Sequence, residues 1–131
     1  MSCNPCDGIL VSEVVEQPDQ RNLLIQRGTD NTLSVTITDG DGRAIAITND
    51  TVKLTVKTGV GGDLVFDKTN APGSHSDPAN GETQFEINPA DTATASETAR
   101  TYWVYDVRRI DVGGEERIHI RGDFTVEPTV S

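Results

Sequence analysis

Apolar and polar residues alternate one by one along several short stretches of this chain, and no other feature constrains its fold as strongly. Successive side chains of a β-strand point to opposite faces of a sheet, so a period of two indicates a strand with one face in a core and the other in water. The pattern occurs in residues 33–38, 52–57 and 84–88 and is clearest in residues 117–126. There the apolar face carries Ile118, Ile120, Gly122, Phe124 and Val126, and the polar face carries Arg117, His119, Arg121, Asp123 and Thr125.

Turn-forming sequences separate the alternating stretches. Residues 39–42 (DGDG) are expected to reverse the chain after residue 38, and residues 111–114 (DVGG) to close a hairpin, because glycine readily supplies the positive φ of tight turns. Asn88 followed by Pro89 predicts a single helical turn between two strands. About seven short strands at this spacing predict an antiparallel β-sandwich or barrel.

The same parity assigns side chains to the core. We expect the apolar face of residues 117–126 to pack against apolar side chains of the other strands, namely Leu33, Val35, Leu54, Val56, Phe85 and Tyr105. Tyr102 and Val104 fall on the opposite parity, which would face solvent. An apolar pair on that side indicates that the face is covered by the N-terminal segment or by a neighbouring molecule.

The chain divides into an N-terminal arm, residues 1–20, and a β-sandwich domain, residues 21–131. The arm holds five aliphatic residues that the strand pattern does not need, and we assign them to partner binding: Ile9, Leu10, Val11, Val14 and Val15. An extended segment of this kind can add as a strand to the sheet edge of a neighbouring protein. The alternative is an extra strand folded back on its own sandwich, since sheet edges need covering. The loop at residues 70–81, rich in Pro, Gly, Ser and Asn, is a second candidate contact.

The charge of the chain disfavours two classes of partner. The chain has 21 acidic and 11 basic residues, a net charge of −10, and no cluster of Lys and Arg. Such a surface repels phosphate backbones and anionic lipids, so neither nucleic acid nor membrane is expected as a partner. No stretch approaches the roughly 20 apolar residues of a membrane span. The first seven residues resemble no signal peptide, which favours synthesis in a cytosol.

Cys3 and Cys6 form the only C-x-x-C pair and are weak candidates for a metal site. Two thiolates supply half of a tetrahedral zinc site, and a second copy of the arm would have to supply the other half. A plain pair of terminal thiols is the simpler interpretation. With two histidines and no convergent nucleophile and base, we expect no enzyme activity, and we expect no cofactor.

The order of short motifs along residues 23–126 resembles the immunoglobulin-like domain of tailed-phage virion proteins, such as baseplate upper proteins and tail-fibre-associated proteins. The motifs that carry the resemblance are QRGTD at 26–30, TDGDG at 38–42, TVKLTV at 51–56, GETQFEI at 81–87, PADT at 89–92, YWVYDV at 102–107 and GDFTV at 122–126. The two-cysteine arm departs from that pattern.

The resemblance implies an all-β, immunoglobulin-like antiparallel β-sandwich of about seven strands with an N-terminal extended arm. It also implies a structural protein that docks onto the tail, baseplate or capsid of a virion, in multiple symmetric copies and after assembly in the bacterial host cytoplasm. Its partners would be other virion proteins, and the family has no catalytic residues to carry over. Two alternatives stay open: a capsid decoration (cement) protein, and a module for adhesion to a host surface or carbohydrate.

Overall fold

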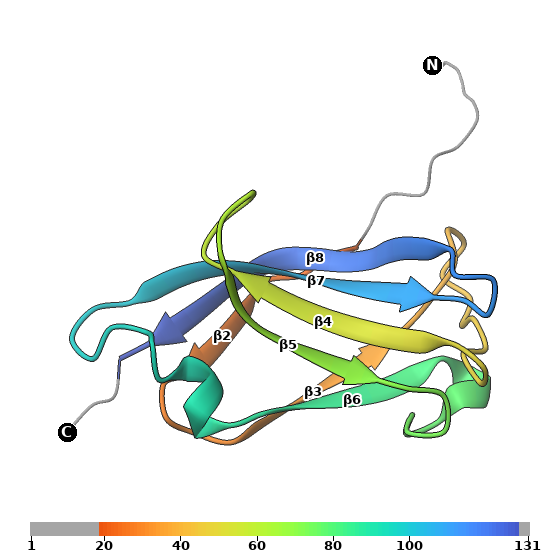
Figure 1. Ribbon diagram of the computed structural model, residues 1–131, viewed down its shortest axis with the longest axis horizontal. Coiled ribbons are helices and arrows are strands. Elements are labelled where there is room, and N and C mark those ends of the chain that lie inside the picture. The colour runs from red at the N-terminus through yellow and green to blue at the C-terminus, as the bar shows by residue number, and fades with distance from the viewer. Residues whose placement is uncertain (1–18, 129–131) are drawn as a thin grey trace, which may run out of the picture.

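The computed structural model describes residues 19–128, which form two facing β-sheets (Figure 1). The elements of this part of the chain are β1 (Asp19–Gln20), β2 (Leu23–Gln26), β3 (Asn31–Thr36), β4 (Thr51–Lys57), β5 (Leu64–Asn70), the 3-10 helix η2 (Pro78–Asn80), β6 (Glu82–Ile87), the 3-10 helix η3 (Pro89–Thr92), β7 (Thr101–Ile110) and β8 (Glu116–Glu127). Because β1 and β2 follow one another along the same side of β8, they act as one interrupted edge strand. The predicted number of about seven strands is therefore confirmed.

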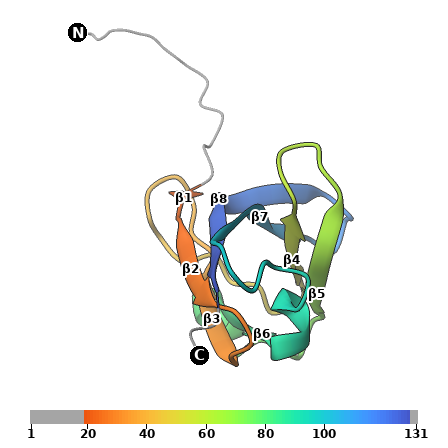
Figure 2. The same cartoon turned by 90° about the vertical axis from the view of Figure 1, so that its left-hand side faces the viewer.

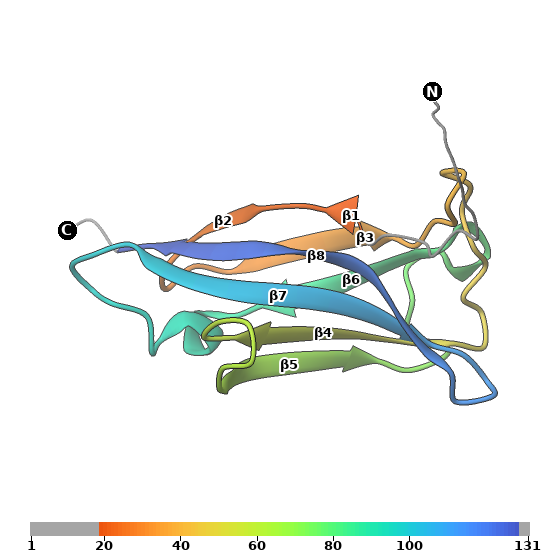
Figure 3. The same cartoon turned by 90° about the horizontal axis from the view of Figure 1, so that it is seen from above.

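The strand order is that of an immunoglobulin-like sandwich. The larger sheet has the order β1-β8-β7-β4-β5, with β2 also on β8, and the smaller sheet pairs β3 with β6. In immunoglobulin terms β3 and β6 correspond to strands B and E, and β4, β7 and β8 to C, F and G. β1 and β2 run parallel to β8, whereas all other pairs are antiparallel. Figures 2 and 3 show the two layers from the end and β1 and β2 alongside β8.

Phe124 of β8 lies at the centre of the core and is fully buried. Its ring centroid is 5.8 Å from that of Phe66, 6.1 Å from that of Trp103 and 6.2 Å from that of Tyr105. These separations are in the range where aromatic pairs attract one another. Residues 19–128 contain no cysteine, so no disulfide joins the two sheets and packing around Phe124 has to hold them together.

The expected core is confirmed with one exception. The predicted residues Val35, Leu54, Val56, Phe85, Tyr105, Ile120, Phe124 and Val126 are buried, and Leu33 packs against them. The assignment of Ile118 to the core was wrong. Val107 pairs with Ile120 but Arg108 pairs with Ile118, so His119 is an extra residue in β8. Such a β-bulge reverses the parity of the residues before it. His119, predicted on the polar face, is therefore buried and Ile118 turns outward.

The predicted turns are confirmed, and two of them share one design. In residues 39–42 the Asp39 carboxylate accepts hydrogen bonds from the backbone N–H groups of Asp41 and Arg43, and Gly42 has a φ of +83°. In residues 111–114 the Asp111 carboxylate likewise accepts hydrogen bonds from the backbone N–H groups of Gly113 and Glu115, and Gly114 has a φ of +86°. These backbone hydrogen bonds lower the pKa of Asp39, because they stabilise its charged form. The helical turn expected at Asn88 and Pro89 is η3.

His75 attaches the long loop after β5 to the sandwich through two hydrogen bonds. Its ring is buried, and its Nε2 lies 2.7 Å from the carbonyl oxygen of Asp50. Because a carbonyl only accepts, Nε2 donates this bond, and Nδ1 lies 3.0 Å from the hydroxyl of Thr83. The loop's histidine is thus used inside the sandwich. The role of residues 70–81 as a contact site stays a prediction.

Candidate functional site

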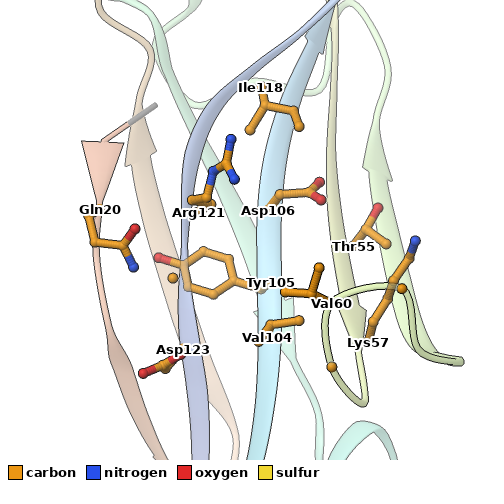
Figure 4. Close-up of a pocket in the computed structure, with 13 residues that line it drawn as sticks. Gln20, Thr55, Lys57, Val60, Val104, Tyr105, Asp106, Ile118, Arg121 and Asp123 are labelled. Atoms are coloured by element: carbon orange, nitrogen blue, oxygen red, sulfur yellow. The ribbon is translucent and has the colours of Figure 1, made fainter. Parts of the chain in front are cut away.

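A groove with a volume of about 380 Å³ crosses the outer face of the larger sheet (Figure 4). We call it the outer groove. Its lining residues are Gln20, Thr55, Lys57, Gly59, Val60, Gly61, Val104, Tyr105, Asp106, Ile118, Arg121, Gly122 and Asp123. They come from four neighbouring strands, β1, β8, β7 and β4, and from the turn that follows β4.

The turn between β4 and β5 forms one wall of the outer groove. Thr58 and Asp63 close its base, with the Thr58 N–H donating to the Asp63 carbonyl and the Asp63 N–H donating to the Thr58 hydroxyl, at 2.9 Å and 3.0 Å. Gly61 has a φ of +74°, which lets the chain reverse there. The turn presents Val60 with 97% of its surface exposed.

Apolar side chains line a substantial part of this face. Val104 and Ile118 line the outer groove together with Val60, and the neighbouring Tyr102 is 67% exposed. The prediction that Tyr102 and Val104 face away from the core is therefore confirmed. Apolar side chains gathered on an outer face are a feature of surfaces that bind another chain or a ligand.

Two cations and two carboxylates line the outer groove: Lys57, Arg121, Asp106 and Asp123. Asp106 lies opposite Arg121 in the sheet, but its carboxylate forms its ion pair with Arg108, at 3.0 Å. Among residues 19–128, Lys57 and Arg121 have no carboxylate oxygen within ion-pair distance. Asp123 is the other acidic residue of the lining.

Cations that form no ion pair within residues 19–128 are unusual in this molecule, whose net charge is −10. Of its 11 cations, seven form ion pairs within the described part of the chain: Arg27, Lys53, Lys68, Arg100, Arg108, Arg109 and Arg117. Of the other four, Arg43 interacts electrostatically with Asp39, and Arg21 has an interaction of its own. The remaining two, Lys57 and Arg121, have no carboxylate partner within residues 19–128, and both line the outer groove.

The strands at the rim are held by a close backbone approach. The carbonyl oxygen of Arg21, between β1 and β2, would lie 1.8 Å from a Cβ atom at position 122, so only glycine fits at Gly122. The Tyr105 hydroxyl donates a hydrogen bond to the same carbonyl at 2.7 Å. Burial raises the pKa of Tyr105 to about 12, because the charged phenolate would be poorly solvated there. These contacts fix Gln20 at the rim of the outer groove.

A second polar group lies near the end of the sandwich. Arg109 forms an ion pair with the buried Asp50 at 3.2 Å and donates a hydrogen bond to Nε2 of His119 at 3.4 Å. Together with the bonds of His75, this network satisfies buried polar atoms within the fold. Neither histidine lines the outer groove.

The residues that the sequence assigned to binding fall outside the described part of the chain. This applies to Cys3 and Cys6 and to the five aliphatic residues of the arm: Ile9, Leu10, Val11, Val14 and Val15. The structure places Asp19 and Gln20, the last two residues of the predicted arm, on the sheet as β1. Within residues 19–128, no three His, Cys, Asp or Glu side chains gather in a way that could hold a metal ion.

Sequence reasoning missed most of the groove-lining residues. The parity of Val104 indicated an apolar outer face. Ile118 was missed because the bulge at His119 turns it outward. Nothing in the local sequence indicates that Lys57 and Arg121 form no ion pair within residues 19–128.

Comparisons with known proteins add a fold neighbour and no family. No protein-family model matches the chain, and no curated protein matches its sequence. A similar solved structure is a strand-swapped dimer of the immunoglobulin-like domain of mouse leukocyte-associated immunoglobulin-like receptor 1. It is 19% identical, covers 89% of this chain and 98% of its own, and has a TM-score of 0.41. Among the described residues there is no helix with the length and apolar character to cross a bilayer.

Proposed function

We propose that this protein is a non-enzymatic assembly module that binds other protein chains through its outer groove and its N-terminal arm. The observation that carries the proposal is the outer groove, where apolar side chains lie beside two cations that form no ion pair within residues 19–128, on a molecule with a net charge of −10. A protein interface combines an apolar centre with a charged rim, and this surface has both. An immunoglobulin-like sandwich serves many functions, so the proposal rests on the site and not on the fold.

The particle we propose is a tailed-phage virion, in which the protein is an immunoglobulin-like subunit of the tail, baseplate or capsid. The order of sequence motifs along residues 23–126 supports this assignment. Multiple copies in symmetric positions, assembled in the cytoplasm of a bacterial host, follow from that role. A decoration protein of the capsid is the alternative within the same class.

Deleting residues 1–18 tests the proposal. The deletion stops before β1, because Asp19 and Gln20 pair with Ile120 and Arg121 of β8. We expect the shortened protein to keep a melting temperature within a few degrees of that of the full chain. When it replaces the full-length protein in the host, we expect it to be absent from the purified particles.

The control is Val112→Asp, which changes an exposed valine outside the outer groove and should leave incorporation unchanged. A second variant, Val104→Asp, places a charge on the groove floor and should reduce incorporation while the domain stays folded. Particles that contain the shortened protein in normal amounts would contradict the proposal, as would unfolding of the shortened protein.

A further inference from the structure

The outer groove sets requirements for what can occupy it. Its apolar lining from Val60, Val104 and Ile118 favours aliphatic side chains. Lys57 and Arg121 favour a partner that brings carboxylates. Asp106 and Asp123 also line the groove, but within residues 19–128 no carboxylate oxygen lies within ion-pair distance of either cation. The fitting ligand is thus a short chain segment that is both aliphatic and acidic.

The arm of this same chain meets both requirements. Residues 9–16 read ILVSEVVE, with five aliphatic side chains and the two carboxylates of Glu13 and Glu16. Residues 1–18 contain no Lys or Arg. The segment therefore complements the outer groove in both polarity and charge.

The arm also starts at the right place. Gln20 lines the outer groove and is held there by its pairing with Arg121 in β8. Glu16 is four residues upstream, which an extended chain spans in about 13 Å at some 3.3 Å per residue. A segment tethered this closely sees its own groove at an effective concentration on the order of millimolar, far above that of any other copy in dilute solution.

We propose that, in the free protein, residues 9–16 lie in the outer groove of their own chain. The aliphatic side chains cover Val60, Val104 and Ile118, and the two glutamates neutralise Lys57 and Arg121. Arm and groove then occupy one another until an assembly partner separates them. This inference concerns the isolated protein and stands apart from the proposed function in a particle.

Photo-crosslinking of the full chain tests the inference. A benzoylphenylalanine at Val60, the most exposed apolar residue of the groove, is illuminated in dilute protein and the products are digested with trypsin. Because the first basic residue is Arg21, the whole arm is released as one peptide, which mass spectrometry identifies. We expect an adduct between position 60 and residues 9–16 in molecules that migrate as monomers.

Two controls define the background. The same photoreactive residue at Val112, an exposed valine outside the groove, measures random collisions with the arm. Reversing both cations in Lys57→Glu/Arg121→Glu should reduce the adduct at position 60 roughly tenfold, because two attractions become repulsions. Arg43→Glu makes a like change outside the groove and should leave the adduct unchanged.

Charge-swapped rescue guards against a variant that fails to fold. Glu13→Lys/Glu16→Lys alters only the arm, should reduce the adduct by a similar factor, and should restore it when combined with the reversed cations. The inference would be overturned if the yield of the adduct at position 60 were no greater than at position 112. It would also be overturned if the adduct were found only in covalent dimers. Incorporation into particles is measured separately, so if the adduct is absent from the chain with native arm and groove charges while incorporation is normal, the inference is refuted and the proposed function stays intact.

Discussion

Replacing Phe124 by alanine should strongly destabilise the sandwich. The side chain is fully buried and contacts three rings, those of Phe66, Trp103 and Tyr105, at centroid distances of 5.8 to 6.2 Å. Truncating a buried Phe to Ala costs about 3–5 kcal/mol, the sum of lost transfer free energy and of the cavity left behind. We expect the upper part of this range, because three aromatic contacts are lost.

Thermal and urea unfolding followed by circular dichroism measure this loss. For a domain of this size 1 kcal/mol corresponds to about 4 °C, so a loss of about 4–5 kcal/mol should lower the melting temperature by roughly 16–20 °C. Phe124→Leu keeps part of the side-chain volume, so its melting temperature should lie between those of the parent and of Phe124→Ala. Val112→Ala, a control at an exposed position, should change the free energy of unfolding by less than about 0.5 kcal/mol. If Phe124→Ala melted within two or three degrees of the parent, about 1 kcal/mol or less, Phe124 would not be the centre of the core.

Two further predictions concern the contacts at the rim of the outer groove. Gly122→Ala should destabilise the protein by about 1–3 kcal/mol, because the new Cβ would collide with the Arg21 carbonyl. The cause is this contact and not the backbone conformation, since Gly122 has no positive φ. An unchanged urea midpoint would show that β1 and β2 move aside at little cost. Tyr105→Phe should cost about 1 kcal/mol through the lost hydrogen bond to Arg21. The pKa of Tyr105 is raised from 10.0 to about 12, so its contribution is complete below pH 10 and is lost as the pH rises through 12. Tyr105→Phe should remove this part of the alkaline loss of stability, and equal slopes for both proteins would contradict the assignment.

The alternation of residues was sufficient to predict most of the strands, the hairpin turns and most of the core, but not β1 and β2, which pair in parallel with β8. Aspartate and glycine at fixed spacing specify the turns locally, as Asp39 with Gly42 and Asp111 with Gly114 do. Such features depend on neighbours in sequence, which is why the sequence alone reveals them.

The outer groove could not be predicted in the same way, because it depends on pairing between distant segments. The bulge at His119 exists only relative to β7, and it decides that Ile118 faces the groove. The need for glycine at position 122 arises from the Arg21 carbonyl, about a hundred residues earlier in the chain. Likewise, it is the folded sheet that leaves Lys57 and Arg121 without an ion pair among residues 19–128.

The parallel pairing of β1 and β2 with β8 also has a consequence for how the domain is made. Asn22 and Asp123, which share a hydrogen bond, are 101 residues apart. At 5–20 residues per second, a ribosome needs roughly 5–20 s to synthesise the partner of the first strands. Contacts of such long range also slow folding, because a large loop has to close before they form. The first strands therefore wait unpaired for the last one, and a nascent chain that stops before β8 has no edge on which to place them.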